Sequence, residues 1–354
     1  MASMDARGNP VSTDDKAALD ALEVALLQYQ SYVGDALGTI DGALARRPDF
    51  VMGQIFRTGL LATFAEARFT ELARESQAAA EQLASAANDR ERALMAATRE
   101  LVAGDWDAGC AALERVLVEH PRDAFAVQTA HLFDFLRGDA KNLRDRITRV
   151  LPAWSADVPG YSYILGMHAF GLEECNQYAE ARATAERALA IEPRDGWAVH
   201  AAVHCCEMQG QVDEGVTFLE SRRDDWAVDN GFAFHNWWHL ALFHLDRGDT
   251  AKVLALFDEV VFPEPGTDVA YQLLDATSLL WRLYLAGTDV RARAARVAEV
   301  WAAKSTEPGF YAFNDVHALL AFVMAERTAD IPAWLVALER AAGDGRSAGA
   351  IGSP

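Results

Sequence analysis

The chain has 354 residues, of which 51% are hydrophobic and 24% are charged, so it can bury a core without disulfides or structural metals. Its formal net charge of −20 makes nucleic acid and acidic membrane surfaces poor candidate partners, because an anionic surface repels phosphate groups. Four cysteines form no disulfide framework and no uncharged apolar stretch of about 18 residues occurs, so we expect a cytoplasmic protein without a membrane span.

The two ends of the chain differ in composition from its middle. The polar stretch at residues 1–13 lacks the apolar run of a signal peptide, and we expect it to be disordered. Residues 14–342 show no shift in composition that demands a boundary, so we expect one tetratricopeptide-like superhelical domain there. Residues 343–354 are rich in Gly, Ser and Ala and are expected to form a flexible tail.

Turn signals divide the middle of the chain at regular intervals. A first, weaker hairpin is predicted over residues 35–47. The later turns lie 34, 38, 34 and 38 residues apart, at Gly104, Gly138, Asn176, Gly210 and Gly248, and Gly287 continues the series. Thirty-four residues is the length of a tetratricopeptide hairpin, and Gly or Asn readily adopts the left-handed conformation that ends a helix.

A repeated segment joins one hairpin to the next. Residues 119–127 and 192–199 share Pro-Arg-Asp, where proline cannot extend the preceding helix and Asp123 or Asp195 can cap the following one. Apolar residues elsewhere recur at helical spacing, and no alternating strand pattern competes with them. The sequence therefore predicts an all-α fold, a tetratricopeptide-type α-solenoid or superhelix of about seven helical hairpins.

Histidine is unevenly distributed over these hairpins. Of nine histidines, all except His120 lie on predicted first helices, the helices that line the concave side of such a solenoid. His200 and His204 are four residues apart with Glu207 three further on, and His235 and His239 repeat the four-residue spacing. This spacing places side chains along one helix face, so we expect a concave pocket, lined by His, Glu and Asp, that binds a small molecule.

Individual roles follow from the chemistry of these residue types. Catalytic acid–base roles are predicted for His204, Glu207, His239, Asp315 and His317. Ligand-binding roles are predicted for His131, His168, Trp197, His200, His235, Asn236, Trp238, Asp275 and Asn314. Histidine titrates near neutral pH, a carboxylate can fix its tautomer, and a side-chain amide can donate to a developing oxyanion. The set is suited to an enzyme of hydrolase or lyase type.

Metal binding and peptide binding are alternative interpretations of the same groove. The two histidine pairs, His200 with His204 and His235 with His239, could hold a divalent transition metal ion, although neither pair includes the Glu of a His-Glu-x-x-His helix. A non-catalytic scaffold that binds a peptide segment is the other alternative. The predicted first helices carry few Lys or Arg for a carboxylate clamp, chiefly Arg57 and Arg282. The oligomeric state stays open, and a dimer is possible.

The same positions carry a resemblance to a known family. The pattern runs over roughly residues 20–340 and consists of Arg144-Asp145, residues 150–154, Pro159-Gly-Tyr161, Gly166-Met167, Phe170-Gly-Leu172, residues 197–200, His204, Glu207-Met208, His235-Asn236, Trp238-His239, Asp275, and residues 313–315 with His317. On these residues the chain resembles the tetratricopeptide repeat protein 38 family. The resemblance implies an all-helical superhelix and supplies no reaction. The positions that match the family pattern are His131, His200, His204, Glu207, His235, His239, Asn314, Asp315 and His317.

Overall fold

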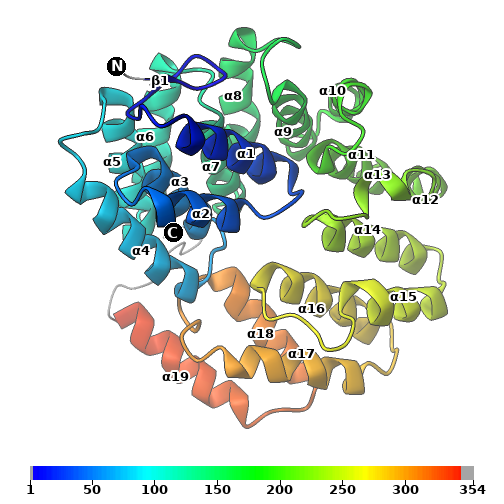
Figure 1. Cartoon of the computed structure of the whole chain (residues 1–354). Helices are drawn as coiled ribbons and strands as arrows, with labels where there is room; N and C mark the ends of the chain where they lie inside the picture. The colour runs from blue at the N-terminus through cyan, green and yellow to red at the C-terminus, as the bar shows by residue number, and fades with distance from the viewer. Residues whose placement is uncertain (1–2, 344–354) are drawn as a thin grey trace. The chain divides into compact units, whose positions relative to one another are not determined.

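The computed structural model describes residues 3–343, and helices form most of this part of the chain (Figure 1). The helices are α1 (Lys16–Ser31), α2 (Ala36–Arg46), α3 (Val51–Ala62), α4 (Ala67–Gln82), α5 (Asp89–Ala103), α6 (Trp106–Glu119), α7 (Ala124–Leu136), α8 (Ala140–Val150), α9 (Tyr161–Glu174), α10 (Tyr178–Ile191), α11 (Gly196–Met208), α12 (Val212–Ser221), α13 (Arg223–Trp226), α14 (Ala233–Asp246), α15 (Thr250–Leu256), α16 (Ala270–Leu285), α17 (Arg291–Ala303), α18 (Ala312–Met324) and α19 (Asp330–Gly343). A 3₁₀ turn, η1 (Leu151–Ala153), follows α8, and a π-helical turn, η2 (Phe257–Val261), follows α15. No helix of the described residues is long and apolar enough to cross a bilayer.

The predicted all-α helical-repeat fold is confirmed, and so is the role of the predicted turns. Every turn residue of the regular series has a positive φ, from 61° at Asn176 to 95° at Gly104. Asp123 and Asp195 accept hydrogen bonds from the amides of Ala126 and Ala198, as expected of residues that cap α7 and α11.

The described chain contains nine successive helix pairs, two more than the seven that the turn residues predict. The additional pairs are α3 with α4 and α18 with α19. Their turns contain Ala65 and Glu326, which take φ values of 52° and 56° without being Gly or Asn. Gly and Asn therefore do not mark these two turns in the sequence, and other residues adopt the left-handed conformation only at a cost in free energy.

The N-terminal residues form a small hairpin where the sequence predicts disorder. Strands β1 (Ser3–Met4) and β2 (Pro10–Val11) pair antiparallel. Between them, the Asp5 carboxylate accepts hydrogen bonds from the amides of Arg7 and Asn9, and the Arg7 guanidinium pairs with Glu23 of α1. Hydrogen bonds and an ion pair between polar residues thus give this segment a defined conformation. The predicted tail, apart from Gly343, lies outside the described residues.

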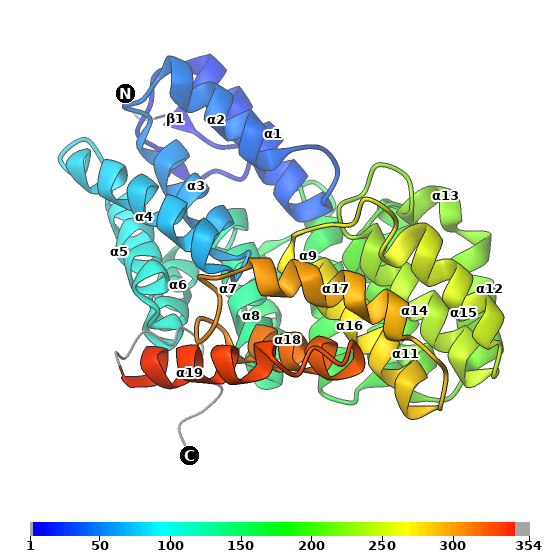
Figure 2. The ribbon, with the colours of Figure 1, turned by 90° about the horizontal axis from the view of Figure 1, so that it is seen from below.

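The described chain divides into two compact units. Unit 1 runs to Cys205, except for Ala65–Ala67, and also includes Asp229–Gly231; unit 2 contains the remaining residues. In unit 1, α9 packs between α8 and α10, and α5 packs on α6 (Figure 1). In unit 2, α16 contacts α14, α17 and α18 (Figure 2). Each unit is therefore a stack of helical hairpins.

Close helix packing in unit 1 depends on Gly171 of α9. A Cβ atom at this position would lie 2.5 Å from the backbone of Leu143 and Arg144 in α8, where no side chain can move aside. We expect Gly171→Ala to lower the free energy of unfolding by about 3 kcal/mol, the upper end of the usual cost of overpacking. Chemical denaturation followed by circular dichroism measures this change.

Gly42 of α2 provides the matched control. A Cβ atom there would lie 3.9 Å from its nearest neighbour, the flexible end of Arg46. Gly42→Ala should leave stability unchanged or raise it by about 0.5–1 kcal/mol, because alanine restricts the unfolded chain more than glycine does. Equal effects of the two substitutions would contradict the role assigned to the α8–α9 contact.

Candidate functional site

The histidines lie on first helices, as predicted. His131 is on α7, His168 on α9, His200 and His204 on α11, His235, His239 and His244 on α14, and His317 on α18. The predicted site residues fall into both units. Histidine thus recurs on the first helices of several hairpins.

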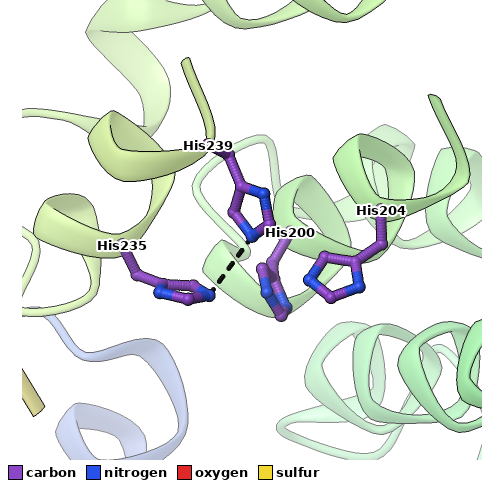
Figure 3. Close-up of side chains that lie close together, drawn as sticks. All are labelled: His200, His204, His235 and His239. Atoms are coloured by element: carbon purple, nitrogen blue, oxygen red, sulfur yellow. Dashed lines mark hydrogen bonds between the residues drawn. The ribbon is translucent and has the colours of Figure 1, made fainter. Parts of the chain in front are cut away.

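A continuous hydrogen-bonded chain of two carboxylates and two imidazoles forms the centre of the candidate site in unit 2. Asp275 Oδ2 of α16 lies 2.8 Å from His235 Nδ1, and Glu207 Oε2 of α11 lies 2.7 Å from His239 Nδ1. The two imidazoles meet through their Nε2 atoms at 3.2 Å (Figure 3). His239 is 1% exposed, whereas the His235 side chain is 22% exposed. The site thus joins a buried imidazole to one that solvent reaches.

The chemistry of these hydrogen bonds fixes where the protons lie. An ionised carboxylate only accepts hydrogen bonds, so both Nδ1 atoms donate. In a neutral imidazole the other nitrogen then carries a lone pair, and the two Nε2 lone pairs face each other at 3.2 Å. A shared proton or another cation between the two nitrogens would make this contact favourable.

Three other predicted site residues of unit 2 are Trp238, His317 and Asn236. The Trp238 ring stacks on His235, with ring centres 5.3 Å apart and planes 11° apart. His317 Nδ1 donates to the carbonyl of Phe313 at 2.8 Å, which leaves its Nε2 as the acceptor. Burial lowers the pKa of His317, so the ring is neutral at pH 7. The Asn236 amide is buried and has no hydrogen-bond partner within residues 3–343.

Asp315 and Asn314 have structural contacts instead of contacts with the histidines. Asp315 Oδ1 accepts from the indole N–H of Trp334 at 3.0 Å and from the Gly309 amide at 3.2 Å. Asn314 Nδ2 donates to the carbonyl of Ala65 at 3.1 Å. Both side chains thus tie α18 to neighbouring segments of unit 2. Within the described residues, neither side chain forms a hydrogen bond with an imidazole.

The buried Asp315 carboxyl leads to a prediction about pH. Burial raises its pKa from 3.8 to about 6, against the opposing hydrogen bonds from Gly309 and Trp334. Because the folded state holds this proton more tightly than the unfolded state, the group's contribution to stability is greatest below about pH 4 and falls as pH rises towards 6. Asp315→Asn should remove this fall and raise the free energy of unfolding at pH 7 by about 2 kcal/mol.

Denaturation midpoints of the wild type and of Asp315→Asn at pH 4 and pH 7 provide the measurement. An asparagine Oδ1 can accept both hydrogen bonds that Asp315 Oδ1 accepts, so the contacts with Gly309 and Trp334 are retained. A wild type whose stability rises relative to the variant between these pH values would contradict the raised pKa.

Unit 1 contains a second carboxylate–histidine pair. Glu173 Oε2, at the end of α9, lies 3.1 Å from His204 Nδ1 of α11, and Glu173 is 4% exposed. Potential ligand atoms of Glu173, Glu174 and His204 all lie within 4.8 Å of one another. The His200 ring is buried, and its centre lies 4.2 Å from that of His204 (Figure 3). Burial, followed by the charge of Glu173, raises the pKa of Glu174.

The other predicted residues of unit 1 lie in less chemically active surroundings. His131 is fully buried against the rings of Phe170 and Trp197, and neither of its nitrogens has a hydrogen-bond partner in the described residues. Burial lowers the pKa of His131 to about 3, so it stays neutral. His168 Nε2 lies 3.1 Å from Thr148 Oγ1, and burial lowers its pKa as well. Trp197 is buried as part of the same aromatic cluster.

Glu173, the acid partner of His204 in unit 1, is absent from the predicted set of site residues. Its spacing was available in the sequence, because Glu173 and Glu207 are 34 residues apart and their partners His204 and His239 are 35 apart. The repeat length of the hairpin therefore also relates the two acid–histidine pairs. Within each pair, the acid and the imidazole come from different hairpins, so a search along single helices misses it.

A comparison with known protein families gives no assignment, since no family model matches the chain. The resemblance to the tetratricopeptide repeat protein 38 family stays a prediction that rests on the residues quoted above.

Proposed function

We propose that the protein binds a divalent transition metal ion through His235 and His239 and uses this centre for acid–base chemistry of hydrolytic type on a small molecule. The observation that carries the proposal is the approach of the two Nε2 atoms to 3.2 Å while both Nδ1 atoms are held by carboxylates. Two nitrogens that bind one zinc ion tetrahedrally at 2.0–2.1 Å would lie about 3.3 Å apart. The imidazole pair is close to this spacing.

The two carboxylates support the proposal because they are the usual outer partners of metal-binding histidines. A carboxylate at Nδ1 fixes the tautomer that presents Nε2 to the ion, and it makes the imidazole a stronger ligand. Asp275 has this position for His235, and Glu207 has it for His239. Imidazole ligands suit zinc, copper, iron and nickel better than magnesium or calcium.

The residues around the pair would supply the remaining functions. A bound divalent ion would act as a Lewis acid that polarises a carbonyl or phosphoryl oxygen. His317, neutral with Nδ1 bonded to a carbonyl, can accept a proton at Nε2. The Trp238 ring orients His235 and excludes water from one of its faces. Together, these roles support a small-molecule site of hydrolase type.

Metal titration of the full chain, purified without a histidine tag, tests the proposal. We expect about one equivalent of zinc or cobalt to bind and to raise the melting temperature, because a ligand of the folded state stabilises it. His120→Ala is the control, since it removes an imidazole on the loop after α6 and should leave binding unchanged. Absence of bound metal, together with no thermal shift with zinc, cobalt or manganese, would reject the metal centre.

His200 and His204 remain predicted further ligands. Single replacements of each by alanine test this part of the prediction separately, by the change in zinc affinity of each variant. Unchanged zinc affinity in both would restrict the ligand set to unit 2.

Peptide binding is the second candidate, and exposed apolar residues on α18 favour it. Phe313, Val316 and Val323 are 42%, 53% and 42% exposed on this first helix. An amphipathic or extended peptide can bind such apolar positions without any metal. A peptide array that gives tight, sequence-dependent binding, lost on Phe313→Ala and kept on His239→Ala, would favour the scaffold over the enzyme.

A further inference from the structure

Arg282 is a cation of the candidate site that is not paired with a carboxylate. It lies on α16, two turns after Asp275, and its Nη1 donates to the carbonyl of Ser278 at 3.1 Å. Within residues 3–343 it forms no ion pair, and it is exposed. Its guanidinium is therefore available to a ligand from solvent.

Other arginines in this part of unit 2 form ion pairs with carboxylates. Arg293 and Arg296 pair with Asp258, Arg291 pairs with Glu326, and Arg327 pairs with Asp330. In a chain with a net charge of −20, carboxylates are abundant, so an arginine at a polar site without one is notable. A structural role in an ion pair does not account for Arg282.

The Trp238 ring contacts both Arg282 and one imidazole of the pair. The guanidinium carbon lies 5.2 Å from the centre of the Trp238 ring, and the same ring stacks on His235. A planar guanidinium stacked on an aromatic ring loses less freedom when its N–H groups bind an anion. Burial lowers the pKa of His317, and the Arg282 charge makes a smaller contribution in the same direction.

We infer that Arg282 is an anion-binding residue, and that the small molecule of this site carries a carboxylate or phosphate group held by Arg282 beside His235 and Trp238. The guanidinium offers two parallel N–H donors, the arrangement that matches both anions. The inference deepens the proposed function, since it gives the chemical class of the ligand. Anion binding by Arg282 does not itself require the metal ion.

The experiment measures binding of inorganic phosphate and of malonate, each alone, to the full chain after metal removal with a chelator. Isothermal titration would compare the wild type with Arg282→Gln, Arg282→Lys and Arg223→Gln. Arg223 is the matched control because it also lies over a tryptophan of unit 2, at 5.1 Å from the Trp237 ring, and forms no ion pair in the described residues. Comparison of phosphate with malonate shows which anion the site prefers.

We expect Arg282→Gln to weaken binding of at least one anion about tenfold or more, because a hydrogen bond to a charged group contributes about 1.5–3 kcal/mol. Arg282→Lys should bind with intermediate affinity, and Arg223→Gln should bind like the wild type. Equal affinities of the wild type and Arg282→Gln, equal losses in Arg282→Gln and Arg223→Gln, or no binding of either anion to the wild type would overturn the inference.

The outcome is independent of the metal proposal. Anion binding that depends on Arg282, in a protein that takes up no metal, would retain the inference and reject the metal centre. Metal binding by a protein in which Arg282→Gln leaves phosphate and malonate binding unchanged would support the metal centre and reject the anion-binding role of Arg282.

Discussion

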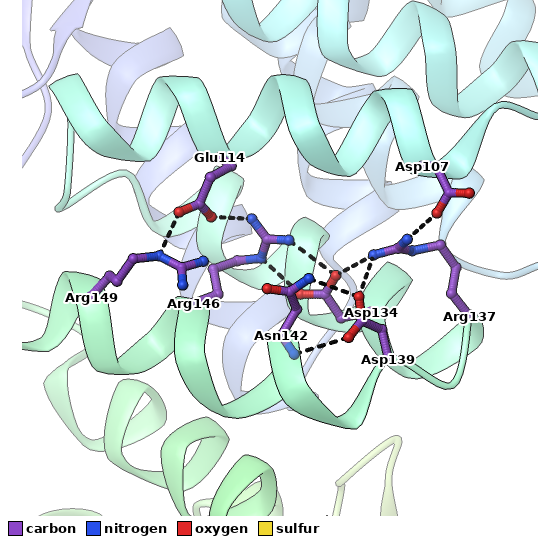
Figure 4. A network of polar contacts seen from close by, with 8 residues as sticks. All are labelled: Asp107, Glu114, Asp134, Arg137, Asp139, Asn142, Arg146 and Arg149. Atoms are coloured by element: carbon purple, nitrogen blue, oxygen red, sulfur yellow. Dashed lines mark hydrogen bonds and ion pairs between the residues drawn. The ribbon is translucent and has the colours of Figure 1, made fainter.

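Replacement of Asp134 with alanine is expected to lower the free energy of unfolding by about 3 kcal/mol, the lower end of the usual cost of breaking a buried ion pair, because Arg146 would keep only its contact with Glu114. Asp134 of α7 is fully buried and accepts hydrogen bonds from two arginines (Figure 4). Its carboxylate lies 2.7 and 3.1 Å from nitrogens of Arg146 and 2.8 Å from Nη2 of Arg137. Arg146 of α8 is itself only 4% exposed, so water cannot replace the lost carboxylate.

Asp107 supplies the control within the same network. It also pairs with Arg137, but its side chain is 84% exposed. Exposed ion pairs contribute about 0–1 kcal/mol, so Asp107→Ala should change the unfolding free energy by less than about 1 kcal/mol. Urea denaturation of both variants measures the difference. Similar small losses in both would show that Asp134 does not hold Arg146 in unit 1.

The second large effect is expected at the imidazole pair. Replacement of both His235 and His239 by alanine should weaken zinc binding by more than about 100-fold, since even the loss of an outer carboxylate partner typically weakens it 10–100-fold. Glu207→Gln should fall within that smaller range, because glutamine can still accept the Nδ1–H hydrogen bond of His239 but lacks the charge. Competition with a chromophoric chelator measures the zinc affinities of the wild type, the double variant and Glu207→Gln.

Circular dichroism must show that the double variant folds, because His239 is buried and its loss leaves a cavity. Substitution of His239 by Gln, which fills more of the space, provides a second test. Zinc affinity equal to that of the wild type in a folded double variant would contradict the proposed centre. A larger loss in Glu207→Gln than in the double variant would assign metal binding to the carboxylate instead.

The helical repeat and the location of the histidines could be predicted from the sequence, whereas the pairing of acids with imidazoles could not. Helix turns depend on local residues such as Gly104 and Asn176, so a spacing search finds them. The predicted set places Glu207 in line with His204 on one helix. In the structure, Glu207 bonds His239 of α14, because a carboxylate near a helix end reaches the next helix, and the packing register decides which imidazole it meets.

The partners of Asp315 and of the N-terminal residues could not be predicted from the sequence either. Asp315 stands in a polar cluster of the sequence, yet its partners are the Gly309 amide and the Trp334 indole. The latter comes from α19, a helix that the turn search missed. At the N-terminus, polar composition suggested disorder, but Asp5 binds its own backbone neighbours and Arg7 reaches Glu23. In both places a polar side chain forms hydrogen bonds with a specific partner, and amino-acid composition alone does not predict that partner.

The acid–histidine pairs have a consequence for how the protein could have arisen. Each pair is split between consecutive hairpins, Glu173 with His204 and Glu207 with His239, one repeat length apart. Duplication of one ancestral hairpin would therefore generate a new complete pair at every internal junction. At the first junction the series would end in an imidazole without an acid. His168 of α9 lies 36 residues before His204 and contacts Thr148 through Nε2, whereas His204 and His239 contact their acids through Nδ1.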